Sequence, residues 1–184
     1  MHFDSVFRGS LTDHPRAELM KAEIGGLIIN AGGIELMIDL MIVAVSLTPP
    51  DVAELRKHTY AQRVKRLQQL AADRQIPKAL QKRLANAIDR AKEVMEMRNK
   101  MAHGCLGLVF RGEADQGQLI GIGVLDLKGT KGRIAPAYTL EQIGAAQNAA
   151  QKACVALEAI YQDIKASIAA VSALPASGEV QAPQ

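Results

Sequence analysis

Residues 25–47 read GGLIINAGGIELMIDLMIVAVSL, a stretch that is apolar on nearly every side of a helix and is broken only by Asn30, Glu35, Asp39 and Ser46. A helix that is hydrophobic all round is buried in a core or spans a membrane. In a bilayer, the two carboxylates would cost about 3 kcal/mol each, which offsets about a dozen aliphatic side chains. We therefore expect a buried central helix, of the kind often shared between protomers, and no membrane insertion.

Helix start and stop signals around this stretch predict four long helices. Thr48-Pro49-Pro50-Asp51 ends the first helix and caps the second, because proline disfavours a helical residue before it and aspartate accepts from free backbone N–H groups. Gly104 is suited to the left-handed position behind the third helix, and Thr139 to Gln142 form a capping box before the fourth. The predicted helices are residues 15 to about 47, 51 to 74, 77 to 103, and 139 to about 172.

Between the last two helices the spacing of apolar residues changes from about four to two. The runs Cys105–Arg111 and Leu119–Leu127 predict a β-hairpin at about residues 105–127, with a bulge or close packing at Gly121 and Gly123. Residues 173–184 carry too little apolar surface to order themselves, so we expect a disordered tail. The sequence predicts a mainly α fold, an up-and-down helical bundle of about four long helices with a small β-hairpin insertion before the last helix, in a single domain over residues 1–172.

Composition excludes several classes of function. The chain has 184 residues, 3% aromatic residues and no Trp, which argues against an aromatic platform for single-stranded nucleic acid. Cys105 and Cys154 stand apart and no secretory segment opens the chain, so we expect a cytoplasmic protein. We expect no metal and no cofactor, because the four histidines are scattered along the sequence: His2, His14, His58 and His103.

Positive charge is concentrated in the predicted second and third helices. Residues 51–103 hold 13 Lys and Arg against 6 Asp and Glu, although the whole chain carries a net charge of only +3. Such a surplus suits a polyanion such as RNA, while the alternative is an ordinary solvated helical face. The candidate phosphate contacts are Arg63, Lys65, Arg66, Arg83 and Lys100.

The most informative segment closes the third predicted helix and reads MRNKMAHG over residues 97–104. Arg98 occupies the apolar stripe, so its guanidinium needs buried counterions, and Glu35 and Asp39 share one helix face at i,i+4 spacing. One interpretation is purely structural, with the charges fixing helix register. The other is chemical: His103, favoured as a cation by the helix C-terminus and disfavoured by Arg98, titrates near neutrality and serves as a general base.

The segment Arg98-Asn99-Lys100-Met101-Ala102-His103 resembles the R-x4-H signature of the higher eukaryotes and prokaryotes nucleotide-binding (HEPN) superfamily, which carries a polar residue after the Arg. The resemblance implies a helical bundle and a metal-independent endoribonuclease that acts as a homodimer with a composite site. It assigns catalysis to Arg98 and His103 and assistance to Asn99, while the acidic pair Glu35 and Asp39 would orient Arg98 or hold it idle. It also implies a toxin or antiviral defence role with an antitoxin or defence-system protein as partner.

The sequence departs from one branch of that family. The branch regulated by a nucleotidyltransferase antitoxin usually has Tyr two positions after the His, where this chain has Cys105. Some members of the family are non-catalytic. The alternative function is therefore a non-catalytic dimeric helical module that binds or scaffolds a protein or nucleotide partner.

Overall fold

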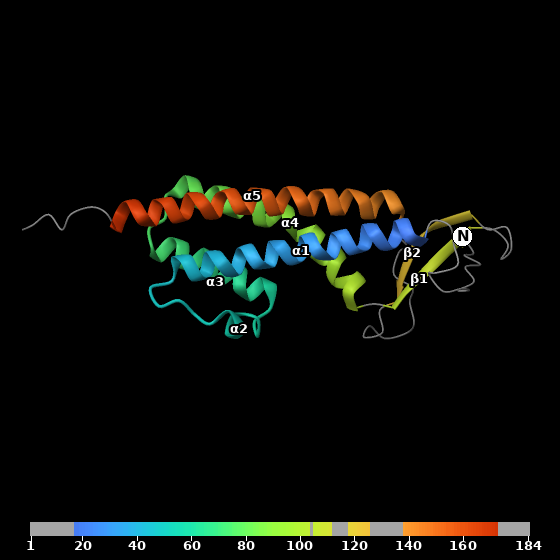
Figure 1. Cartoon of the computed structure of the whole chain (residues 1–184), viewed down its shortest axis with the longest axis horizontal. Helices are drawn as coiled ribbons and strands as arrows, with labels where there is room; N and C mark the ends of the chain where they lie inside the picture. The colour runs from blue at the N-terminus through green and yellow to red at the C-terminus, as the bar shows by residue number, and fades with distance from the viewer. Residues whose placement is uncertain (1–16, 104, 112–117, 126–137, 173–184) are drawn as a thin grey trace, which may run out of the picture. The chain divides into compact units, whose positions relative to one another are not determined.

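The computed structural model describes residues 17–103, 105–111, 118–125 and 138–172, with backbone alone for residues 17, 103 and 172 and for both strands. The described part is mainly α-helical, as the sequence predicted (Figure 1). The predicted start near Pro15 and the tail beyond Ser172 lie outside the described residues. The elements are α1 (Ala17–Val45), α2 (Val52–Leu55), α3 (Tyr60–Asp73), α4 (Lys78–His103), β1 (Cys105–Arg111), β2 (Gln118–Leu125) and α5 (Leu140–Ser172).

The chain divides into two compact units, each built from two separate stretches of sequence. The first unit comprises residues 1–34 and 88–155, and the second comprises residues 35–87 and 156–184. Helices α1, α4 and α5 each contribute residues to both units. Neither unit is therefore a continuous stretch of the chain.

Helix α1 is buried along one face within the described chain, and its burial by a second protomer stays a prediction. Its buried residues recur every three or four positions, as expected for one side of a helix. On other faces Ile29 is 75% exposed and Leu36 is 42% exposed. The uniformly apolar sequence therefore contains more hydrophobic surface than the described chain covers. The buried residues are Met20, Ile24, Leu27, Ala31, Ile34, Ile38, Met41, Ile42 and Val45.

The single helix predicted over residues 51–74 is in fact two helices, α2 and α3. The Asp51 carboxylate accepts from the Ala53 N–H at 2.8 Å and caps α2, which ends after one turn. Thr59 then starts α3 through a capping box in which its hydroxyl accepts from the Gln62 N–H and the Gln62 side chain accepts from the Thr59 N–H. Thr59 is therefore the N-cap of α3, at a position inside the single helix that the sequence predicted over residues 51–74.

A tight turn joins α3 to α4 within the second unit. Gln75 has a positive φ of 54°, and the N–H groups of Gln75 and Ile76 donate to the carbonyls of Ala72 and Ala71. This pair of hydrogen bonds is a Schellman motif, which normally uses glycine at the left-handed position. Ile76 is buried behind it, and α4 begins after Pro77 as predicted.

The predicted β-hairpin is present as the antiparallel pair β1 and β2. Val109 pairs with Gly121 and Phe110 pairs with Leu119, so Ile120 is an extra residue on β2. This irregularity is a β-bulge, and it lies beside the glycine at which the sequence predicted a bulge or close packing. The hairpin belongs to the first unit and follows directly after α4.

In the first unit, helices α1 and α5 approach closely at two glycines. A Cβ at Gly33 would lie 2.9 Å from the Cys154 Sγ, and a Cβ at Gly26 would lie 2.3 Å from the Gln147 side-chain nitrogen. Glycine at position 33 thus allows these two helix segments to approach closely, whereas at Gly26 the flexible end of the Gln147 side chain could move aside.

The predicted capping box begins α5, since the Thr139 hydroxyl accepts from the Gln142 N–H at 3.2 Å.

Candidate functional site

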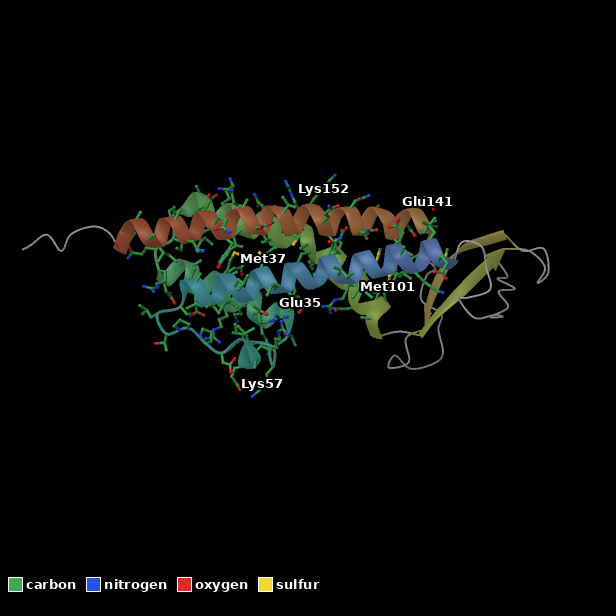
Figure 2. All side chains as sticks on the ribbon, viewed as in Figure 1. Glu35, Met37, Lys57, Met101, Glu141 and Lys152 are labelled. Carbon is green, nitrogen blue, oxygen red and sulfur yellow. The ribbon has the colours of Figure 1, made fainter. Side chains whose placement is uncertain are left out.

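A buried cluster of charges in the second unit joins α3 to α1. The Arg63 Nη1 donates to both carboxylate oxygens of Asp39, at 2.7 and 2.8 Å, and its Nη2 donates to Glu35 at 2.5 Å. Arg63 is 5% exposed and Asp39 is 1% exposed, whereas the Glu35 side chain is 22% exposed. Figure 2 labels Glu35 on α1, next to the start of α3. Two carboxylates therefore share one guanidinium.

Local sequence explains how these three residues meet. Glu35 and Asp39 are one helical turn apart on α1, so their side chains project from the same face. Arg63 lies one turn into α3, where its N–H donates to the Thr59 carbonyl at 3.0 Å. The capping box at Thr59 fixes where α3 begins and therefore which α3 residue faces the two carboxylates.

Tyr60 lies in the field of the same cluster. Burial and, to a smaller extent, the Glu35 charge raise the pKa of its hydroxyl, Arg63 opposes the shift, and the net pKa is about 12. Burial alone would lower the pKa of Arg63, but its hydrogen bonds to Glu35 and Asp39 hold that pKa above its usual range. No protein atom hydrogen-bonds the Tyr60 hydroxyl or the Arg63 Nε in the described part of the chain. Both groups stay protonated at neutral pH.

The structure corrects the prediction that Arg63 is a phosphate contact, because its guanidinium is buried and occupied by two carboxylates. Lys65, Arg66 and Lys100 are exposed, as a phosphate contact requires. Arg83 is half-exposed and donates to Asp163 of α5 at 2.7 Å. Of the five predicted contacts, Lys65, Arg66 and Lys100 are thus the better candidates.

The predicted catalytic motif closes helix α4 in the first unit. The backbone is helical through His103, so Arg98, Asn99 and His103 occupy the last two turns. Arg98 is half-buried, and its Nη1 donates to the Asn99 Oδ1 at 2.8 Å. The His103 side chain and Cys105 side chain lie outside the part of the structure that is described. The geometry therefore connects Asn99 to Arg98 directly, consistent with an assisting position.

The predicted pairing of Glu35 and Asp39 with Arg98 joins residues of different units and stays a prediction. What the structure establishes is their pairing with Arg63, a residue that the sequence had assigned to the surface. Sequence reasoning missed Arg63 and Tyr60 as members of a buried cluster. The available signal was the Thr59-x-x-Gln62 capping box, which places Arg63 on the first turn of a new helix.

No protein-family model, curated protein or solved structure matches this chain. Among the described residues, no group of three or more His, Cys, Asp or Glu side chains is arranged to hold a metal ion. Within the same residues one helix, Glu18–Val45, is long and apolar enough to cross a membrane by length and composition. The residues that can carry chemistry are therefore the α4 terminus and the charged cluster.

Proposed function

We propose that this protein is a metal-independent endoribonuclease of the HEPN type that acts as a homodimer. The observation that carries the proposal is the Arg98-Asn99-x3-His103 motif on the final turns of α4, with the half-buried Arg98 hydrogen-bonded to Asn99. A mainly helical fold with a hairpin directly after the motif supports it. A fixed guanidinium close in sequence to an imidazole is suited to transfer of a phosphoryl group.

In the proposed reaction, the ribose 2′-hydroxyl attacks the adjacent phosphorus while His103 accepts its proton. The O2′–P bond forms, the P–O5′ bond breaks, and the products are a 2′,3′-cyclic phosphate and a 5′-hydroxyl. Arg98 neutralises the charge that grows on the phosphorane oxygens. A proton must reach the departing O5′, and His103 of a second copy is the proposed donor.

The charged cluster has a supporting part in this proposal. Arg63 fixes α3 against α1 by binding both carboxylates. In the proposal Glu35 and Asp39 also act on Arg98, which they would orient or hold idle. The proposed RNA contacts are the exposed Lys65, Arg66 and Lys100, because exposed cations reach phosphates without a desolvation penalty.

We further propose a cytoplasmic location, without insertion of α1 into a membrane. Asp39 lies inside the membrane-length helix and is held by Arg63 of α3. Insertion of α1 would either break this buried pair or carry the exposed Lys65 and Arg66 of α3 toward the bilayer. Each charge at the bilayer centre costs about 3 kcal/mol. A role as a toxin or defence effector, with an antitoxin or defence protein as partner, belongs to the same proposal.

The experiment compares cleavage of a labelled RNA by the wild-type chain and by His103→Ala and Arg98→Ala, in the presence of EDTA. We expect the two variants to lose at least about a hundredfold in rate, with cyclic phosphate ends in the wild-type products. Exposed residues of the same types provide matched controls, His58→Ala and Arg90→Ala, and these should cleave at the wild-type rate. All four variants should keep the wild-type melting temperature to within a few degrees.

The alternative function is a non-catalytic dimeric binding module. The observation that favours it is that Arg63 donates to both carboxylate oxygens of Asp39. These hydrogen bonds give the acidic pair a structural role that requires no catalysis. If neither the wild type nor any variant cleaves RNA, while the chain remains dimeric and folded, the nuclease proposal fails and the binding module is retained.

A further inference from the structure

A shallow apolar hollow lies between the C-terminal halves of α1 and α5, within the second unit. Its volume is about 370 Å³. The α1 residues at its wall are spaced i, i+3, i+4 and the α5 residues i, i+4, i+7, i+8, so each helix presents one face to it. The hollow exists because alanines stand where larger side chains would fill it. The lining residues are Leu40, Val43, Ala44, Tyr161, Lys165, Ile168 and Ala169.

The polar side chains at this hollow are those of Tyr161 and Lys165. The Lys165 ammonium lies over the Tyr161 ring, 5.4 Å from its centroid. Lys165 makes no ion pair with any residue that the structure describes, and the nearby Asp163 is bound to Arg83. An aliphatic wall with an uncompensated cation at its edge is complementary to a molecule with an aliphatic chain and an anionic head.

From this complementarity we propose that the hollow binds a free aliphatic carboxylate, with the chain against Leu40, Val43 and Ile168 and the carboxylate beside Lys165. At about 30 Å³ per small group, the volume accommodates roughly a dozen non-hydrogen atoms, which corresponds to a chain of about ten carbons. The inference does not depend on the proposed ribonuclease activity, because every residue involved lies outside the α4 motif.

Two other occupants fit the hollow less well. Binding to an anionic membrane surface requires several basic residues together, whereas α5 carries only Lys152 and Lys165 among its described residues. A contact with a second copy through this hollow would cover the exposed Lys165 ammonium, and the lining offers no carboxylate to pair with it. A concave wall with a single cation therefore favours a small monoanion.

The test is calorimetric titration of the protein with decanoate, kept below its micelle concentration, and with decanol. Decanol has the same ten-carbon chain as decanoate but no charge. We expect decanoate to bind at least about threefold more tightly than decanol, and Lys165→Gln to remove that difference. Filling the hollow with Ala169→Phe should abolish binding of both. The exposed Ala166 on the same helix does not line the hollow, so Ala166→Phe should bind both like the wild type.

A second variant, Ala44→Leu, fills the hollow from α1 and keeps the test valid if Ala169→Phe alters folding, which circular dichroism would show. Equal binding of decanoate and decanol, or wild-type binding by folded Ala169→Phe and Ala44→Leu, overturns the proposal. So does a failure of the wild type to bind decanoate. If Ala169→Phe converts a dimer to a monomer, the hollow is instead a contact between two copies of the chain. If the protein floats with anionic vesicles but does not bind decanoate, the hollow instead binds a membrane surface.

Discussion

Replacement of Arg63 by Met should destabilise the protein far more than replacement of any exposed arginine. Met keeps much of the aliphatic volume, so the main effect is electrostatic: Asp39, which is 1% exposed, is left as a buried carboxylate without its counterion. Removing one partner of a buried ion pair costs about 3–5 kcal/mol. For a chain of this length that corresponds to a fall in melting temperature of about 6–20 °C.

The assay is urea unfolding followed by circular dichroism at neutral pH, with Arg66→Met as the matched control. Arg66 lies on the same helix and is exposed, so its replacement should change stability by no more than about 0.5 kcal/mol. Asp39→Leu introduced together with Arg63→Met should recover most of the loss, because it removes the stranded charge. Equal stability of Arg63→Met and Arg66→Met would refute the structural assignment of Arg63.

The loss of folding stability in Arg63→Met should depend on pH in a defined direction. In Arg63→Met, protonation of the buried Asp39 neutralises the uncompensated charge, while the unfolded chain keeps an ordinary aspartate that is still ionised at about pH 5. The folded variant then binds more protons than the unfolded one, so its stability deficit should shrink as the pH falls from 7 to 5. In the wild type, Arg63 stays charged throughout this range, since its pKa is raised.

Two further predictions concern neighbouring glycines and a tyrosine. Gly32→Ala should stabilise the protein by up to about 1 kcal/mol, because a Cβ there meets no atom within 4 Å. Gly33→Ala should be less stable than Gly32→Ala by about 1–3 kcal/mol, because its Cβ would collide with the Cys154 Sγ at 2.9 Å; a double-mutant cycle with Cys154→Ala that shows no coupling would contradict this. Tyr60 has a raised pKa of about 12, so it contributes stability below about pH 10 that is lost as the pH rises toward 12. Tyr60→Phe should therefore lose less stability than the wild type over that interval, and absorbance at 295 nm should show one tyrosine ionising late.

Most helix boundaries could be predicted from capping residues and glycine, because these signals act within one turn of the chain. Thr139 and Gln142 started α5 as expected, and Pro77 and Gly104 bracket α4. The same signature at Thr59 and Gln62 begins α3, whereas the prediction continued one helix through this point. A capping box therefore marks a helix start even inside a segment that otherwise suits one continuous helix.

Side-chain partners were harder to predict, because they depend on which helices lie next to one another. The sequence indicated correctly that Glu35 and Asp39 need a cation, since two carboxylates at i,i+4 interrupt an apolar helix. It could not select Arg63 from eleven arginines. The sequence of α3 shows a surplus of positive charge, but this surplus does not tell whether one arginine is buried or all of them face solvent. The one-sided burial of α1 was likewise invisible in a pattern that is apolar all round.

Each compact unit is assembled from two distant stretches of sequence, and this limits how the protein can be cleaved or unfolded. No single peptide-bond cleavage releases either unit as a continuous fragment, and no short connector separates them, since α1, α4 and α5 pass from one to the other. Limited proteolysis should therefore not release either unit as a single folded fragment. Unfolding should follow one shared transition, because fraying of any of these three helices weakens both cores at once.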